Sequence, residues 1–232
     1  VETGPQRAPA AHRDAVYRRL LAALALSNEH RAQLSKRGIP TERHNDYATL
    51  PERGPKRWDA VNAVLGAGLD PNGVPGLRIE RVRWTLAGAA GLLVPCMNVE
   101  GLIVALKVRV DGATSGKYRY LTSAPEGPRA EPAAHVPVGT PWGQPVLRVT
   151  EGELKSSAAF SLSGVPTISV PGVGSWRAAL PVIEELAPEA VQVAFDADAA
   201  TNPAVDRAGR ELVAAVRETG RPCVRLRWDI AE

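Results

Sequence analysis

The sequence is poor in cysteine: its 232 residues include two, Cys96 and Cys223, which lie far apart. There is no Cys-X-X-Cys motif, and no histidine stands at the spacing of a metal ligand. Neither a zinc module nor a disulfide framework is therefore indicated. We expect both thiols to behave as small buried hydrophobic side chains.

Long apolar runs are lacking as well. No run is long enough to span a bilayer and no signal peptide is recognisable, so we expect a cytoplasmic protein without membrane contact. Hydrophobic residues make up 44% of the chain and charged residues 23%. This composition allows a substantial core, in one large or two small domains.

The formal net charge is small, at +3, but the charged residues are unevenly distributed along the chain. Residues 1–145 carry 19 Lys and Arg against 13 Asp and Glu, whereas residues 146–232 carry 9 against 12. A basic half beside an acidic half suits a polyanion held in front of a metal site. Scattered solubilising charge is the alternative interpretation.

The first 70 residues are expected to be a flexible leader (1–12) followed by a helical region (13–70). Apolar residues at helical spacing predict a helix from Asp14 to about Leu26. Ser27 or Asn28 then caps a second helix, so the region begins as a helical hairpin. It is either a reader of DNA or an appendage for packing and partner docking. Trp58 is expected to anchor a later short helix in the core.

Residues 71–145 have the pattern of a smaller α+β subdomain with antiparallel strands. Residues 81–84 alternate, and a hairpin turn at 98–101 joins two apolar strands. In the second of these strands, Lys107 and Arg109 share one face. Residues 124–144 are expected to be a linker, in which a structural role is favoured for His135.

Cations and aromatic residues interleave at Lys117, Tyr118 and Arg119. Such a strip can hold a phosphate backbone and stack bases. A half-buried edge strand has the same composition. Both interpretations are open from this segment alone.

Residues 146–232 alternate between strands and helices, which indicates an α/β domain with a roughly four-stranded parallel sheet. Two acidic clusters follow short apolar strands: Glu151 and Glu153 in one case, Asp196 and Asp198 in the other. The carboxyl ends of parallel strands meet at one edge, where ligand sites lie. Oxygen ligands of this kind suit Mg²⁺ or Mn²⁺. The alternative is that acidic residues are common at strand ends and helix N-caps.

A glycine-containing loop after the second strand belongs to the same edge. Gly172, Gly174 and Ser175 precede a predicted helix, whose free N–H groups favour an anion such as phosphate. A tight turn that requires glycine explains the composition equally well.

Together, a strand ending in Glu-Gly and a later strand ending in Asp-X-Asp resemble the Toprim domain of primases, topoisomerases and related nucleases. The resemblance implies that Glu151 acts as general acid or base and that Asp196 and Asp198 bind Mg²⁺, with Glu151 and Glu153 as further candidate ligands. Bacterial primases carry an aspartate four residues after the glutamate, where this chain has Lys155. Lys155 is then expected to pair with Glu151 or to reach a nucleotide phosphate.

Residues 71–145 resemble the basic subdomain of bacterial primase catalytic cores. That resemblance rests on an apolar strand ending in proline, an Asn-X-X-Gly turn, a strand ending in arginine and a Lys-Tyr-X-X-Leu-X-Ser stretch. It implies that Arg109 and Lys117 bind template and nucleotide across a cleft from the metal site. Lys107, Tyr118 and Arg119 are further candidates.

Nearly the whole chain is similar to an uncharacterised Toprim family in replication proteins of plasmids, phages and integrative elements. The resemblance implies a primase-type nucleotidyltransferase that uses Mg²⁺ (or Mn²⁺), single-stranded DNA and nucleoside triphosphates to make short primers. A helicase, another replication protein or further domains of the same polypeptide are the expected partners. The alternatives are a Toprim nuclease and a non-catalytic module for nucleic-acid binding or replisome docking.

Overall fold

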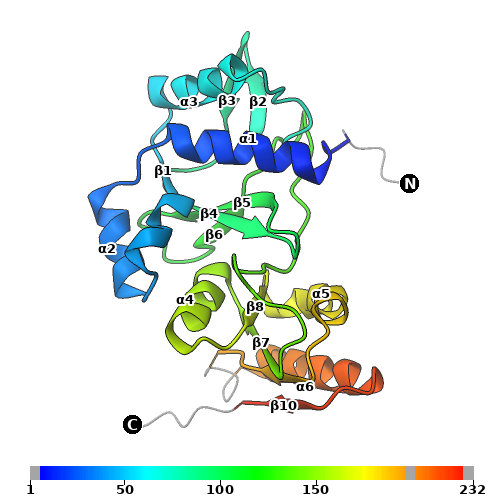
Figure 1. The fold of residues 1–232 in the computed structure, drawn as a ribbon. Helices are drawn as coiled ribbons and strands as arrows, with labels where there is room; N and C mark the ends of the chain where they lie inside the picture. The colour runs from blue at the N-terminus through cyan, green and yellow to red at the C-terminus, as the bar shows by residue number, and fades with distance from the viewer. Residues whose placement is uncertain (1–5, 197–201, 227–232) are drawn as a thin grey trace. The chain divides into compact units, whose positions relative to one another are not determined.

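A computed structural model describes residues 6–196 and 202–226 of the chain. These residues form two compact units, each with a four-stranded sheet (Figure 1). The first unit comprises residues 6–36, 40–96 and 102–131, and the second comprises residues 37–39, 97–101 and the chain from 132 onward. Within the described ranges, no helix has the length and apolar character needed to cross a bilayer.

The predicted helical hairpin opens the first unit. Helix α1 (Ala10–Ala23) begins four residues before the expected Asp14, because the two alanines after Pro9 are strong helix formers. The N–H group of Ala8 donates to the carbonyl oxygen of Gly73 at 2.8 Å. The described residues before the helix are thus held against the unit, and the expected flexible leader to residue 12 is wrong for this part.

Helix α2 (Asn28–Lys36) follows, and a 3₁₀ helix (Thr41–Asp46) comes after it. The hydroxyl of Ser27 accepts a hydrogen bond from the N–H group of His30 at 3.2 Å. This is the geometry of an N-cap, in which a side-chain oxygen satisfies a backbone donor that has no partner within the helix. The capping role predicted for this position is confirmed for Ser27.

Helix α3 (Pro55–Gly66) begins with proline, whose fixed φ suits the first helical position. The expected core role of Trp58 is wrong, since its side chain is 37% exposed and Arg83 lies over its ring at 5.4 Å. The neighbouring Arg57 is buried instead. The helix turns Arg57 inward because its guanidinium finds backbone carbonyl oxygens there.

The sheet of the first unit has the strand order β1-β4-β5-β6, with antiparallel β1–β4 and β5–β6 pairs. The predicted hairpin turn at 98–101 joins β4 to β5, and Gly101 donates to the carbonyl oxygen of Asn98 at 3.1 Å. A separate hairpin pairs β2 with β3, and Arg81 lies in its turn rather than in a strand. The strands are β1 (Ala48–Leu50), β2 (Leu77–Glu80), β3 (Arg83–Leu86), β4 (Gly91–Met97), β5 (Ile103–Val110) and β6 (Tyr118–Tyr120).

The second unit is built on a parallel sheet with the strand order β10-β9-β7-β8. Helices connect successive strands, as the alternating sequence pattern predicts. The strands are β7 (Val146–Glu151), β8 (Thr167–Val170), β9 (Ala190–Val193) and β10 (Cys223–Arg225). The connecting helices are α4 (Glu153–Ser163), the 3₁₀ helix Val173–Ala178 with α5 (Ala179–Leu186), and α6 (Pro203–Glu218).

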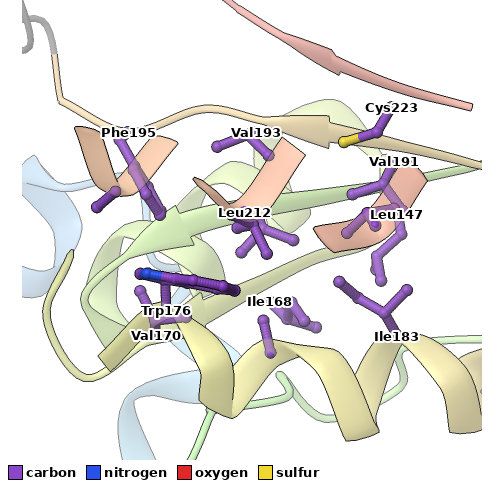
Figure 2. Packing of buried hydrophobic residues seen from close by; sticks show 14 of the residues in the cluster. Leu147, Ile168, Val170, Trp176, Ile183, Val191, Val193, Phe195, Leu212 and Cys223 are labelled. Carbon is purple, nitrogen blue, oxygen red and sulfur yellow. The ribbon is translucent and has the colours of Figure 1, made fainter. Parts of the chain in front are cut away.

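One hydrophobic cluster lies between this sheet and the helices α5 and α6 (Figure 2). It includes Leu147 and Val193 from the strands, Ile183 from α5 and Leu212 from α6. Helix α4 packs against β7 and β8 and lies outside that cluster. The sheet is therefore covered by helices on both faces, as all-parallel sheets require.

Both cysteines are buried free thiols, as predicted. Burial raises the pKa of Cys223, at the start of β10, to about 11. The α/β class, the parallel sheet, the antiparallel subdomain and the N-terminal helical hairpin that the sequence predicts are all present in the structure.

Candidate active site

The ends of β7 and β9 lie side by side at the carboxyl edge of the parallel sheet. The register pairs Val149 with Val193, and the N–H group of Ala194 continues the ladder by donating to the carbonyl oxygen of Val149 at 2.8 Å. Asp196 follows the end of β9 by three residues, and its carboxylate contacts Lys155 in the first turn of α4, which follows Glu151 and β7. The structure thus brings one acidic residue from each predicted cluster to the same edge.

Lys155 is the direct partner of Asp196. Its ammonium donates to both carboxylate oxygens of Asp196, and the two side chains are 46% and 41% exposed. The expected pairing of Lys155 with Glu151 is replaced by this contact, because the first turn of α4 carries the lysine toward the end of β9. The edge therefore contains its own cation.

Glu153 differs from the other acidic residues of the site. It occupies the first turn of α4, where a carboxylate is favoured by the helix dipole, and it is only 2% exposed. Its carboxylate is thus shielded from solvent, which makes it less accessible than Glu151 and Asp196. Asp198, the second aspartate of the Asp-X-Asp pattern, lies outside the described residues.

The donor chemistry at this edge suits a hard divalent cation, since Glu151 and Asp196 both offer carboxylate oxygens. Across residues 6–196 and 202–226, no group of three or more His, Cys, Asp or Glu residues is arranged to hold a metal ion. Glu151 and Asp196 fit Mg²⁺ by ligand type alone, as a pair of carboxylates. Lys155 already holds the carboxylate of Asp196.

The predicted phosphate-binding loop has a different form from the one expected. Gly172 precedes a 3₁₀ helix of six residues, and Gly174 lies within it. This short helix has a weaker dipole than the regular helix that was predicted here. Gly172 has an extended backbone, neither glycine lies in the left-handed region that favours glycine, and a Cβ atom at either position would meet nothing within 4 Å. A turn that requires glycine is therefore not the explanation either. Ser175 closes the turn through its N–H group, which donates to Gly172 at 2.8 Å.

Trp176 fixes the end of this loop to α6, a role that sequence reasoning missed. Its indole is buried, and Nε1 donates to the carboxylate of Glu211 at 3.0 Å. The guanidinium of Arg177 lies 4.2 Å from the centre of the Trp176 ring. The stretch that follows β8 is thus anchored by an aromatic side chain rather than by glycine geometry.

In the first unit, strands β5 and β6 bring the predicted cations and aromatics together. The register pairs Lys107 with Tyr120 and Arg109 with Tyr118. Lys107 is only 3% exposed, with its ammonium 4.6 Å from the centre of the Tyr120 ring. This burial argues against its expected contact with a nucleic acid. Arg109 donates to the side chain of Gln33 at 2.9 Å.

The short strand β6 and the residue before it carry the exposed part of this group. Lys117 and Arg119 are exposed, and Tyr118 is 39% exposed. Arg119 donates to the carbonyl oxygen of Gly116 at 3.2 Å, which leaves most of its guanidinium donors facing outward. Two cations and an aromatic ring are thus presented on an edge strand.

His135 has a structural role, as the sequence favoured. Its Nδ1 accepts a hydrogen bond from the N–H group of Met97 at 3.0 Å, and its Nε2 lies 3.2 Å from the hydroxyl of Ser157. Its backbone also pairs with Ser169. The residue therefore joins Met97, the last residue of β4, to the parallel sheet within the second unit.

A buried histidine in the first unit was not identified from the sequence. His30 is 2% exposed and bridges Thr49 Oγ1 at 2.7 Å and Asp111 Oδ1 at 3.0 Å. The arrangement links α2, β1 and the end of β5. No local pattern could have revealed it, because the three residues are widely separated in sequence.

No model of a known protein family matches the sequence, and no curated protein does. Solved structures match it over almost its whole length, and those described here are bacterial primases. The Aquifex aeolicus primase, comprising zinc-binding and RNA polymerase domains, has a TM-score of 0.72 at 12% identity. That match covers 96% of this chain and 56% of the Aquifex chain, so this chain spans little more than half of it.

Two further structures are primase cores that contain DNA. A DnaG primase catalytic domain bound to single-stranded DNA has a TM-score of 0.59 at 17% identity, covering 97% of this chain and 76% of that one. The RNA polymerase domain of Mycobacterium tuberculosis DnaG, in complex with a double-stranded DNA oligomer with a 6-nucleotide overhang, has a TM-score of 0.61 at 17% identity. That match covers 90% of this chain and 81% of the mycobacterial one. At these identities the likeness is one of fold: the chain has the fold of a bacterial primase catalytic core.

Proposed function

We propose that this chain is the catalytic core of a primase-type nucleotidyltransferase, which joins nucleoside triphosphates into short primers on single-stranded DNA. The observation that carries the proposal is the carboxyl edge of the parallel sheet, where β7 ends at Glu151 and Asp196 follows the adjacent strand β9, within a primase-core fold. Phosphoryl transfer needs mainly positioning and electrostatic stabilisation, and carboxylates that hold Mg²⁺ supply part of both.

The roles of the site residues follow from their chemistry. Asp196 and Asp198 would hold Mg²⁺, with Glu151 as a further ligand or as the group that takes the proton from the attacking hydroxyl. A divalent ion held by these residues would supply neutralising charge to the transferring phosphate and would lower the pKa of the attacking hydroxyl. Lys117 and Arg119 would contact phosphates of the template or nucleotide, Arg109 would assist them, and Tyr118 would stack on a base.

The biological setting is proposed on the sequence resemblance. Similarity to replication proteins of plasmids, phages and integrative elements favours a role in copying a mobile element or phage. Such a core works with a helicase, with another replication protein or with further domains of its own polypeptide. These partners would select the template and bring the core to it.

Primer synthesis on single-stranded DNA, with labelled nucleotides and Mg²⁺ or Mn²⁺, tests the proposal. Replacing both Asp196 and Asp198 with alanine should abolish product formation. Replacing both Glu184 and Glu185 with alanine is the control for altered charge, because it also removes two carboxylates, and these are exposed near the end of α5. Undiminished synthesis by the double variant would rule out this site.

A nuclease is the second candidate, favoured by the Lys155–Asp196 ion pair. A lysine at the position of the primase aspartate changes the charge of the metal site, and a cutting enzyme of the Toprim class is compatible with that change. Incubating labelled single strands with metal, with and without nucleotides, separates the two functions. Shortened strands without nucleotides indicate the nuclease, and extended products that need nucleotides indicate the primase. Binding with neither reaction indicates the non-catalytic module.

A further inference from the structure

Lys155 and Asp196 form an ion pair at the position where the proposed function needs a divalent cation. Lys155 is the only lysine from residue 132 to the end of the sequence. It lies three residues after Gly152, whose carbonyl oxygen accepts a hydrogen bond from the N–H group of Lys155 at 3.1 Å. The start of α4 therefore fixes the lysine backbone beside the end of β9, and the side chain reaches Asp196 from there.

The ammonium of Lys155 contacts both oxygens of the Asp196 carboxylate. A divalent ion needs at least one of these oxygens in direct contact, and it repels a neighbouring ammonium. The two cations thus compete for the same ligand. We propose that Lys155 is a resident counter-cation of the site: it neutralises Asp196 in the metal-free protein, and a divalent ion binds Asp196 by displacing it.

The pair has the properties of an exchangeable contact rather than a structural one. Both side chains are close to half exposed, at 46% and 41%, and exposed ion pairs contribute little to stability. Releasing Lys155 therefore costs the fold little. The aspartate that bacterial primases carry at this position would attract a divalent ion, whereas lysine weakens its binding. The identity of residue 155 would then determine the metal affinity of the whole edge.

This inference rests on the proposed metal site and adds a consequence for substrate binding. Once displaced, the Lys155 ammonium remains at the carboxyl edge on its long flexible stem. There it can approach a phosphate oxygen of the nucleotide. Metal binding and phosphate binding would thereby be coupled through one side chain.

The test is a titration of the metal-free protein with Mn²⁺, followed by electron paramagnetic resonance, without DNA or nucleotide. Lys155→Met should bind Mn²⁺ about tenfold more tightly than wild type, since it removes a positive charge from beside the ion. Lys155→Arg, which keeps the charge, should stay within about twofold of wild type by the same electrostatic argument. Arg221→Met controls for the change in total charge, and Asp196→Asn should lose the site.

A second measurement follows the lysine itself. The sequence contains five lysines, so a protein labelled with ¹³C-lysine gives a simple set of Cε signals, and Lys155→Arg identifies the one from Lys155. Added Mg²⁺ should move that signal toward the position of a free exposed lysine. Circular dichroism confirms that each variant is folded.

Equal Mn²⁺ affinities of wild type and Lys155→Met, an unmoved Lys155 signal, or absence of Mn²⁺ binding in all proteins would overturn the inference. Primer synthesis is scored separately. If synthesis fails while Lys155→Met still binds Mn²⁺ more tightly, the proposed function fails and the counter-cation role stands. If synthesis succeeds with equal affinities, the function stands and the counter-cation role fails.

Discussion

The guanidinium of Arg57 donates two hydrogen bonds to the carbonyl oxygen of Pro51, at 2.9 Å from Nε and 2.6 Å from Nη2. Its Nη1 donates to Leu86 at 2.8 Å and to Gly88 at 2.9 Å. The side chain is 1% exposed, and burial lowers its pKa from the ordinary value. One side chain thus ties α3 to the segment after β1 and to the end of β3.

Replacing Arg57 with methionine should destabilise the protein by about 3 kcal/mol, because three carbonyl oxygens, one buried and two partly buried, lose their donors. Arg57→Lys should restore little of the lost stability, since an ammonium cannot reproduce the planar set of donors of a guanidinium. The loss is measured by urea unfolding followed by circular dichroism. Arg53→Met is the matched control, as the Arg53 side chain is 69% exposed, and it should cost less than about 0.5 kcal/mol. Equal effects of the two substitutions would show that the Arg57 contacts contribute nothing specific.

The contrast between Arg57 and Trp58 shows where sequence reasoning about the fold succeeds and fails. Helix α3 was predictable from its apolar spacing and its flanking proline and glycine. The residue that the helix turns toward the core was not predictable, because residue type favours tryptophan over arginine in a core. The decision depended on the carbonyl oxygens of Pro51, Leu86 and Gly88, and chain segments distant in sequence provide two of these acceptors.

The parallel sheet was more predictable than the candidate site. Short apolar strands alternating with helices determine the order of elements and the edge at which Glu151 and Asp196 lie. The partner of Lys155 was not predictable, since local helical spacing favours Glu151 on the same segment and says nothing of Asp196. The burial of Lys107 was unpredictable for a similar reason: its place in β5 follows from the sequence, but its contact with the ring of Tyr120 comes from the neighbouring strand.

The hydrogen bonds of His135 should select one tautomer of its ring in the folded protein. The N–H group of Met97 points at Nδ1, so the hydrogen of the neutral ring lies on Nε2, toward Ser157. His135→Ala should reduce the free energy of unfolding by about 1 to 3 kcal/mol, because the Met97 donor loses its acceptor. His135→Asn, whose side-chain oxygen can replace Nδ1, should recover part of this loss. Ser157→Ala, which removes the weaker contact, is the control.

If asparagine and alanine at position 135 are equally destabilising, the Met97 contact is not the source of the effect. A direct measurement is the amide hydrogen exchange of Met97. Its protection should fall in His135→Ala and return in His135→Asn. Unchanged protection in both variants would contradict the role assigned to the ring.

Cys223 should make the protein sensitive to alkaline pH. Burial raises the pKa of its thiol from an ordinary value of 9.0 to about 11. Below pH 9 the thiol is protonated in both the folded and the unfolded chain, so its contribution to stability is complete. Between about pH 9 and 11 the unfolded chain releases the proton first, and the free energy of unfolding falls.

Unfolding in urea at several pH values from 8 to 11 measures this fall. The free energy of unfolding of Cys223→Ala should depend less on pH than that of wild type in that window, whatever the stability of the variant at pH 8. The folded wild-type protein should also react slowly with a disulfide reagent at pH 8, because the thiolate is scarce and buried. Rapid reaction without unfolding, or identical slopes for the two proteins, would contradict the raised pKa.

The edge strand β6 should contribute to nucleic-acid affinity through charge. Replacing both Lys117 and Arg119 with alanine should weaken binding to single-stranded DNA and reduce the slope of log K against log salt by about 1.4, or about 0.7 for each lost phosphate contact. Fluorescence anisotropy of a labelled oligonucleotide at several salt concentrations gives both quantities. Lys36→Ala, at the end of α2, is a control for the loss of charge in the same unit.

Lys107→Met separates a surface role from a buried one. The Lys107 ammonium lies on the ring of Tyr120 and is 3% exposed, so its removal should leave the salt slope unchanged and lower the stability of the fold. A reduced salt slope in Lys107→Met would show that Lys107 reaches the nucleic acid after all. A salt slope that is unchanged in the Lys117 and Arg119 double variant would instead remove β6 from the binding surface. Only cations that contact phosphates release counterions, which is why the slope distinguishes the two positions where affinity alone would not.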